Sequence, residues 1–284
     1  SLPTAVITTL LFAWHPLRTE VVAWISSRTE IMVLLFGLAS LLALQKSQFY
    51  HKIFFALFLA CSLLSKESAI LFPFLATAVS PKSTIRNRWF LIVSPVLLGG
   101  WFYLRRVSVG TTQWFGSTLE MSLRPAAALK SLVHYTKTHF WPSKLSIEPW
   151  FDFPESWIDS GVFLGAVILA GLLFLVARFI RKDPPERLIA SGAIWYFLCL
   201  IPFMHILPLP ERAADRYANM ASVGFVLMIA GALELMRRNS RFHMNWYRGT
   251  IISLGVVSLL FACVSFNLSS YWMSDQDMEY RAAM

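Results

Sequence analysis

The stretch SGVFLGAVILAGLLFLVARFI, residues 160–180, is an apolar run whose one charged residue, Arg178, stands near its end. An α-helix needs about 20 apolar residues to cross the hydrocarbon core of a bilayer. The run has that length without help from its neighbours. The stretch therefore predicts a helix that crosses a membrane.

Apolar runs recur along the whole chain, and we expect nine of them to be helical. They are residues 2–14, 30–45, 53–64, 69–79, 89–104, 160–180, 188–209, 221–236 and 249–268. Apart from 160–180, only 188–209 and 249–268 reach spanning length unaided, so the others need flanking residues or tilt. The pair 53–64 and 69–79 is either two short spans or one broken, re-entrant element. The predicted fold is an all-α polytopic membrane helix bundle, with one membrane domain over residues 1–268.

The composition also indicates a membrane protein. Of the 284 residues, 14% are charged, whereas soluble domains carry about 25%. A net charge of +9 would suggest nucleic acid in a soluble protein,. Because the basic residues stand in clusters between apolar runs, we interpret them as topology signals and predict no nucleic-acid partner. The three cysteines fall inside apolar runs and predict neither disulfides nor zinc.

The links between the apolar segments alternate in charge. Links 45–52, 80–88, 181–187 and 237–248 hold about half of the Lys and Arg residues but few of the acids. By the positive-inside rule these basic links are cytoplasmic. The alternate links then face the outside or the lumen, and they are residues 15–28, 65–68, 105–159, 210–220 and 269–284. We expect an integral multi-pass protein of a bacterial inner membrane, or of the endoplasmic reticulum membrane if the source is eukaryotic.

The longest outer link, residues 105–159, contains an amphipathic pattern. Apolar residues such as Leu129, Leu132 and Phe140 alternate with Arg124, Lys130 and other basic residues at helical spacing. This pattern is typical of a helix lying on the membrane surface, over about 123–140. Membrane lipids are therefore predicted partners.

Ionisable side chains gather in the outer links, close to apolar segments. Groups of this kind at membrane level are functional candidates by default, because their burial is costly. Our candidates for a substrate cavity are His15, Arg18, Glu20, Arg28, Glu30, Lys66, Glu67, Asp215 and Tyr217. The alternative is that these groups are ordinary helix ends in water: a solvated hairpin tip at Lys66-Glu67 and a capped helix start at Asp215.

Three arginines are candidates for binding the phosphate of a lipid-linked donor. Arg105 and Arg106 stand at the outer end of 89–104, where the positive-inside rule does not predict adjacent arginines. Binding to a lipid phosphate would explain their presence there. Arg216 offers a guanidinium fork for a phosphate, with Asp215 beside it to orient it. The alternative for the first two is snorkelling to the interface.

Several known catalytic motifs are absent from the sequence. It has no Walker A loop, Rossmann fingerprint, GxSxG, HExxH or CxxC motif,. A transferase built from this chain would therefore use a lipid-activated donor. No cofactor is evident apart from that donor, and the sequence leaves a divalent metal undecided.

Four motifs in order resemble the transmembrane-and-TPR protein family and its bacterial relatives, in the C-type glycosyltransferase (GT-C) superfamily. They are LFAWHPLRTEVVAWISSRTEIMVLLF (11–36), SLLSKESAILFP (62–73), HYTKTHFWPSKLSI (134–147) and ADRYANMASVGF (214–225). The resemblance covers about 12–279. It implies a GT-C-like membrane domain over 1–268, with 269–284 leading into a tetratricopeptide array.

The resemblance also implies an activity. A sugar, mannose in eukaryotic members, would pass from a polyprenyl-phosphate donor to a Ser or Thr hydroxyl of an acceptor protein. In GT-C proteins the base is an acid in the first outer loop, which we expect to lie before Ser1, so the catalytic residue stays unknown. The chain departs from the family pattern at Arg18, at Glu30, where the family usually has Asp, and over 217–222.

Two other functions remain open at the level of sequence. The chain could be a non-catalytic membrane anchor for a tetratricopeptide scaffold. It could also transport a lipid-linked sugar, which predicts charged residues deep within the spans. Only Glu234 comes near that description, so transport is the weaker of the two,.

Overall fold

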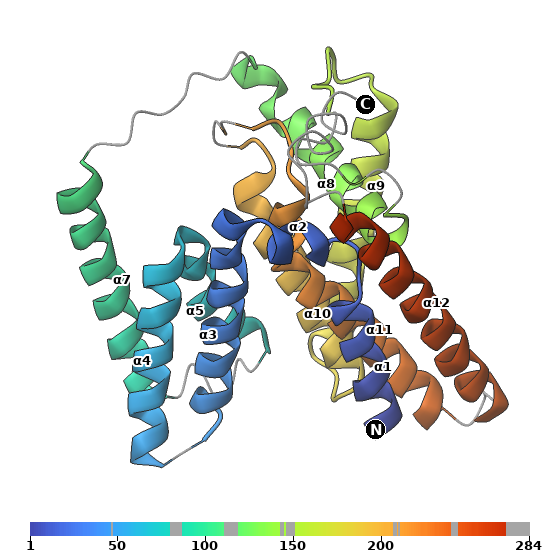
Figure 1. The fold of residues 1–284 in the computed structure, drawn as a ribbon, viewed down its shortest axis with the longest axis horizontal. Coiled ribbons are helices and arrows are strands. Elements are labelled where there is room, and N and C mark those ends of the chain that lie inside the picture. The colour runs from blue at the N-terminus through green and yellow to red at the C-terminus, as the bar shows by residue number, and fades with distance from the viewer. Residues whose placement is uncertain are drawn as a thin grey trace. The chain divides into compact units, whose positions relative to one another are not determined.

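The computed structural model describes residues 1–46, 48–79, 87–110, 119–142, 145, 151–206, 209, 211–239 and 244–270 (Figure 1). Within these ranges the chain is helical, and they contain no β-strand. The chain forms two compact units: the first unit is Ser1–Ile25 with Ser117–Met284, and the second unit is Ser26–Gly116. The predicted lead-in at 269–284 lies outside the described residues beyond Ser270.

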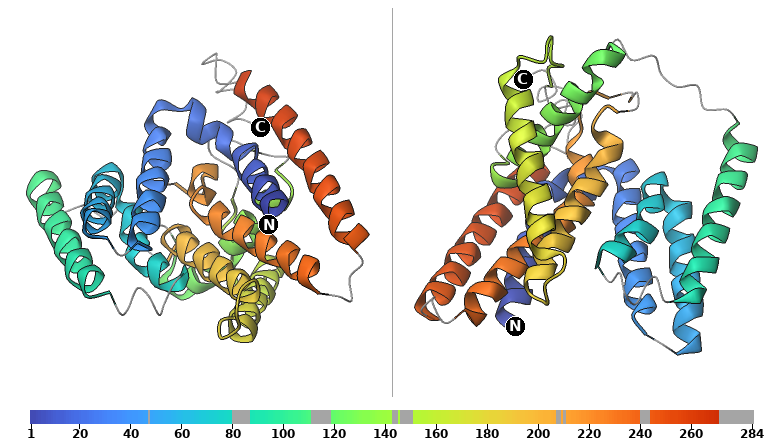
Figure 2. Two further views of the ribbon diagram at one scale, coloured as in Figure 1. Left: turned by 90° about the horizontal axis from the view of Figure 1, so that it is seen from below. Right: turned by 180° about the vertical axis from the view of Figure 1, so that it is seen from behind.

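The first unit is a helical bundle. Its α-helices are α1 (Leu2–Ala13), α2 (Arg18–Ala23), α8 (Arg124–Phe140), α9 (Ser160–Phe179), α10 (Glu186–Leu200), α11 (Ala221–Arg238) and α12 (Met244–Ser270). Short 3-10 helices are η3 (Met121–Leu123), η4 (Ile201–Phe203) and η5 (Asp215–Ala218). Helix α1 packs against α11 and α12, and α10 packs along α11 (Figure 2).

Local sequence accounts for where α8 and α9 begin. Pro125 occupies the first turn of α8, where its missing N–H costs nothing,. The Asp159 carboxylate caps α9 by accepting the Gly161 N–H at 2.6 Å, and it also pairs with Lys130 of α8 at 2.8 Å,. The predicted amphipathic helix is thus present as α8. Its buried face is packed within the first unit, and its place on a membrane surface stays a prediction.

The boundary between the units falls within η1 (Ile25–Ser27), after Ile25. The other helices of the second unit are α3 (Arg28–Leu44), α4 (Phe49–Ser65), η2 (Glu67–Leu71), α5 (Phe72–Val79) and α7 (Arg88–Val109). Helix α4 packs against both α3 and α7 (Figure 1). Ser62 of α4 donates a hydrogen bond to the Val33 carbonyl of α3 at 2.9 Å. Asn87 caps α7 through the Trp89 N–H at 3.1 Å,.

Among the described residues, five helices are long and apolar enough to cross a membrane, which suggests a membrane protein. They are Ile25–Leu44, Arg88–Ser108, Ser160–Phe179, Glu186–Phe203 and Met244–Ser270. The apolar runs predicted spanning length only for the last three. The other two helices are longer than the runs 30–45 and 89–104 because they include residues from the polar flanks. The polar Arg28-Thr29-Glu30 turn, for example, is helical rather than part of a link.

The segment 53–79 contains one long helix and a broken return. Lys66 has an extended backbone and ends α4. The return consists of five residues of 3-10 helix in η2 and eight residues of α-helix in α5. The described part of this return, residues 67–79, is shorter than the about 20 residues that a span needs,.

In the second unit, the described basic links lie at one end. The Trp89 indole N–H of α7 donates to the Lys52 carbonyl of α4 at 3.1 Å, so these two helices start side by side. Arg105, near the end of α7, pairs with Glu67 just beyond the end of α4. The ion-paired outer residues are therefore at the opposite end from Lys52 and Arg88. Most of the 80–88 link lies outside the described residues.

In the first unit, too, the basic links and the motif residues lie at opposite ends. At one end the Arg238 guanidinium donates to the Pro184 carbonyl at 2.9 Å, which brings together the links on either side of α10 and α11. At the other end the Ser265 hydroxyl donates to the Trp14 carbonyl at 2.9 Å, directly before His15. The basic links thus lie apart from the motif residues, as the alternation predicted. Which end faces the cytoplasm stays a prediction.

Candidate functional site

The His15-Pro16 turn fixes where α2 begins. The His15 Nδ1 accepts the Leu17 N–H at 3.2 Å, so the ring proton is on Nε2, which donates to the His139 carbonyl of α8 at 3.0 Å. Burial lowers the His15 pKa to about 4, which keeps the ring neutral, with one donor and one acceptor nitrogen,. His15 therefore ties α2 to α8, and its predicted place in a substrate cavity stays a prediction.

Glu20 of α2 binds Arg216 of η5 through both carboxylate oxygens. The Arg216 Nη1 donates to Oε1 at 2.7 Å, and the Arg216 backbone N–H donates to Oε2 at 2.8 Å. The side chains are 7% and 9% exposed. Burial raises the Glu20 pKa, and the hydrogen bonds and charge of Arg216 oppose that rise,. The pair joins two motifs that lie 196 residues apart in the sequence.

Arg216 also binds a second carboxylate and two aromatic rings. Its Nη2 donates to Glu211 Oε2, which also accepts the Tyr217 hydroxyl at 2.7 Å. The guanidinium lies 4.8 Å from the centre of the Trp24 ring and 5.1 Å from that of Tyr217. Burial raises the Tyr217 pKa, so the phenol stays a neutral donor. We call Glu20, Trp24, Glu211, Arg216 and Tyr217 the Arg216 cluster.

A second network lies beside it and was not predicted from sequence. The Arg18 guanidinium donates to the Ser222 hydroxyl of α11 and, at 3.3 Å, to the Asn219 carbonyl. The His139 Nε2 is 2.9 Å from the same hydroxyl. The His139 Nδ1 is 2.7 Å from the Tyr135 carbonyl, so it carries the proton and Nε2 accepts,. The single proton of the Ser222 hydroxyl therefore has two acceptors, the His139 Nε2 and the Ala218 carbonyl.

Asp215 lies in the same 3-10 turn as Arg216 and is 3% exposed. The Asp215 charge helps to raise the pKa of the Tyr135 phenol of α8, after burial and Tyr217. The predicted role of Asp215 in orienting Arg216 stays a prediction.

The remaining candidates belong to the second unit. The Lys66 ammonium binds the Glu30 carboxylate, which is 2% exposed. The Arg105 guanidinium binds Glu67 and lies 5.5 Å from the centre of the Trp101 ring. Burial raises the Glu67 pKa, but a backbone hydrogen bond and Arg105 outweigh it and leave the pKa below its usual value.

Arg28 and Arg106 are exposed at this end of the second unit. The predicted set therefore divides in two: His15, Arg18, Glu20, Asp215, Arg216 and Tyr217 in the first unit, and Arg28, Glu30, Lys66, Glu67, Arg105 and Arg106 in the second unit. A single cavity lined by both groups stays a prediction.

Polar side chains of the quoted motifs bind other quoted motifs. The His15 side chain of the first motif donates to the His139 backbone carbonyl of the third, and Glu20 binds the Arg216 side chain of the fourth. Glu30 of the first motif binds Lys66 of the second. Each motif therefore supplies a partner for another one.

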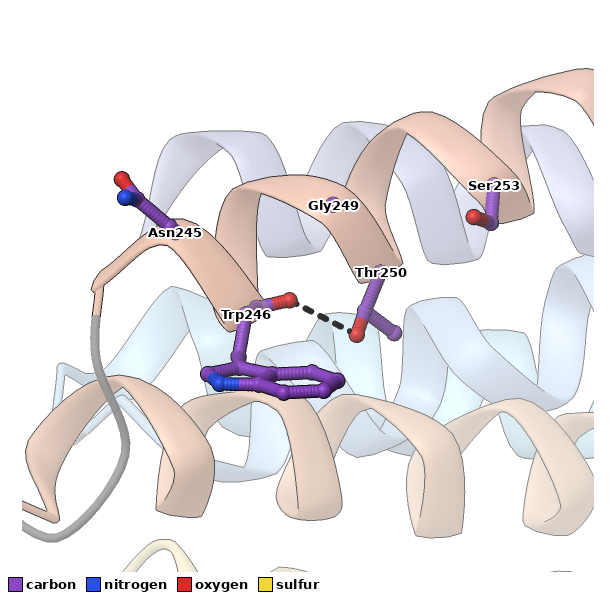
Figure 3. Close-up of a pocket in the computed structure, with 5 residues that line it drawn as sticks. All are labelled: Asn245, Trp246, Gly249, Thr250 and Ser253. Carbon is purple, nitrogen blue, oxygen red and sulfur yellow. Dashed lines mark hydrogen bonds between the residues drawn. The ribbon is translucent and has the colours of Figure 1, made fainter.

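A cavity of about 460 Å³ opens along the first turns of α12, at the basic-link end of the first unit (Figure 3). Asn245, Trp246, Gly249, Thr250 and Ser253 line it, and Thr250 donates to the Trp246 carbonyl at 2.9 Å. None of the candidate residues lines this cavity. Across the described ranges, we find no group of three His, Cys, Asp or Glu side chains placed to hold a metal ion.

Comparisons with protein-family models, with curated proteins and with solved structures found no match for this chain. The family resemblance therefore depends on the four sequence motifs.

The buried, neutral histidines predict acid sensitivity of the first unit. Burial lowers the pKa of His139 to about 3 and that of His15 to about 4, both from 6.5. Between these values and 6.5 the unfolded chain binds more protons, so stability is fully present above pH 6.5 and is lost as the pH falls. Each pKa unit corresponds to about 1.4 kcal/mol. We expect the melting temperature of the detergent-solubilised protein to fall by several degrees across this window.

The matched variants for this pH series are His139→Gln and His51→Gln, the latter in the second unit. The His139→Gln protein should melt lower near neutral pH but decline less steeply on acidification. The His51→Gln protein should follow the wild type. Equal declines for His139→Gln and wild type would contradict a stabilising role for the neutral His139 ring.

Proposed function

We propose that this chain is the multi-pass membrane part of a GT-C-type glycosyltransferase. It would transfer a sugar from a polyprenyl-phosphate donor to Ser or Thr hydroxyls of a protein on the non-cytoplasmic side. The observation that carries the proposal is the mutual binding of the motifs, through His15 and His139, Glu20 and Arg216, and Glu30 and Lys66. Glu20, Arg216 and Glu30 are also buried, unlike residues that merely end helices in water.

The proposed chemistry needs groups for a sugar and for a phosphate. The acceptor hydroxyl attacks the anomeric carbon while a base takes its proton, and cations stabilise the departing lipid phosphate. Arg216 already faces two carboxylates, which makes it a poor phosphate ligand. We therefore keep Arg105 and the exposed Arg106 as the candidates for the donor phosphate.

The test is transfer of label from radiolabelled polyprenyl-phosphate mannose in membranes that contain the full-length protein. Wild type should label protein, and Arg106→Ala should reduce the rate by about tenfold or more, because one cation is worth that much at a developing phosphate charge. Arg181→Ala, at an exposed arginine of a basic link, is the matched control. No transfer by wild type, or equal rates for Arg106→Ala and wild type, would contradict the proposal.

One observation favours the alternative of a non-catalytic anchor. The most buried ionisable groups, Glu20, Arg216 and Glu30, bind other protein side chains, which is how structural ion pairs behave,. An anchor predicts that no label is transferred. It also predicts that Glu20→Gln and Arg216→Ala change the amount of folded protein in cells and nothing else.

A further inference from the structure

The Arg216 cluster opens to solvent at Glu211. The Glu211 side chain is 29% exposed, against 9% for Arg216 and 7% for Glu20. Both hydrogen bonds to its carboxylate end on Oε2. Within the described ranges they leave Oε1, an acceptor, on the exposed side of the cluster.

Glu211 is not needed to compensate the charge of Arg216. Glu20 already pairs with that guanidinium and accepts the Arg216 backbone N–H as well. A second carboxylate on the same cation brings two like charges together, and Glu211 contributes to the raised Glu20 pKa,. Glu211 holds Arg216 and Tyr217 through one carboxylate oxygen, which leaves its second oxygen as an acceptor for a ligand,.

The chemistry of this opening suits a ligand rich in hydroxyl groups. A carboxylate only accepts hydrogen bonds, so the ligand must bring donors. A phosphate offers mainly acceptor oxygens and so pairs poorly with this acceptor. The half-buried Trp24 ring and the Tyr217 ring flank Arg216 and give the opening apolar faces beside its acceptors.

We propose that Glu211 binds the sugar substrate, with its Oε1 accepting a hydrogen bond from a sugar hydroxyl. This assignment rests on the proposed function and names the residue that contacts the sugar. Glu20 would then act as a positioning residue that holds Arg216 and, through it, Glu211 Oε2.

The first test measures transfer with the full-length protein in membranes. Glu211→Gln keeps the shape of the side chain but loses the charge-assisted hydrogen bond. Its KM for polyprenyl-phosphate mannose should rise about 10- to 100-fold, with a smaller change in kcat. Glu155→Gln, an exposed acid of the same unit, is the matched control. An unchanged KM for Glu211→Gln would overturn the proposal.

The second test needs no activity. A water-soluble carbodiimide with an amine tags exposed carboxylates, which mass spectrometry then locates. Glu211 should be tagged faster than Glu20, and methyl α-D-mannoside should slow tagging at Glu211 but not at Glu155. Protection by inorganic phosphate instead, or no protection by the sugar, would overturn the proposal. If wild type transfers no mannose but the sugar protects Glu211, the sugar site stands and the transferase function fails.

Discussion

Replacing Arg216 by methionine is expected to lower the free energy of unfolding of the first unit by about 3–5 kcal/mol, because it leaves the buried Glu20 carboxylate without its cation,. For a unit of this size, the melting temperature should fall by roughly 6–20 °C. The loss should shrink at low pH, since an uncompensated Glu20 can be protonated. Thermal unfolding of the detergent-solubilised protein, followed by intrinsic fluorescence, measures both effects.

The double variant Glu20→Gln with Arg216→Met separates a buried pair from a general packing defect. Removing both charges leaves no orphaned ion, so the double variant should be more stable than Arg216→Met alone. Arg238→Met is the matched control, because this partner of Glu234 is 52% exposed and such pairs contribute at most about 1 kcal/mol,. A loss for Arg216→Met no larger than that of the control would contradict the buried ion pair.

The helical architecture could be predicted from hydrophobicity alone. Each predicted apolar segment contains a helix, because such runs satisfy their backbone groups internally wherever they are placed. Helix ends were harder to predict. Arg28 was predicted to be a link residue, yet it forms the first turn of α3 together with Glu30, which is buried against Lys66.

The partners within the candidate site could not be predicted from sequence. The sequence identified Glu20 and Arg216 as important residues, but their pairing depends on how α2 and η5 pack. His139 and Ser222 were missed for another reason. Both lie inside quoted motifs, but each is a single uncharged polar residue on a helix, and only the hydrogen bonds that join them to each other and to Arg18 mark them.

Helix α11, which carries Ser222 of the candidate site, packs closely against α10. Gly224 of α11 makes this close contact possible. A Cβ added at Gly224 would lie 2.4 Å from the Tyr196 backbone nitrogen and 2.5 Å from the Gly192 carbonyl oxygen. These are backbone atoms, so the helices would have to separate. Small residues at such crossings let membrane helices approach closely. We expect Gly224→Ala to lower the free energy of unfolding by about 3 kcal/mol, the upper part of the range for overpacking.

Gly171→Ala is the matched control for this substitution. No atom lies within 4 Å of a Cβ at Gly171 of α9, so alanine there should be neutral or stabilise the helix by up to about 1 kcal/mol,. Gly224→Ala should also disturb the candidate site, because α11 carries Ser222 and begins three residues after Ala218, where η5 ends. The measurement is thermal unfolding of both variants, with carbodiimide tagging of Glu20 as a probe of the cluster. Equal stability of the two variants, with Glu20 still protected, would show that the glycine contact does not hold η5 in place.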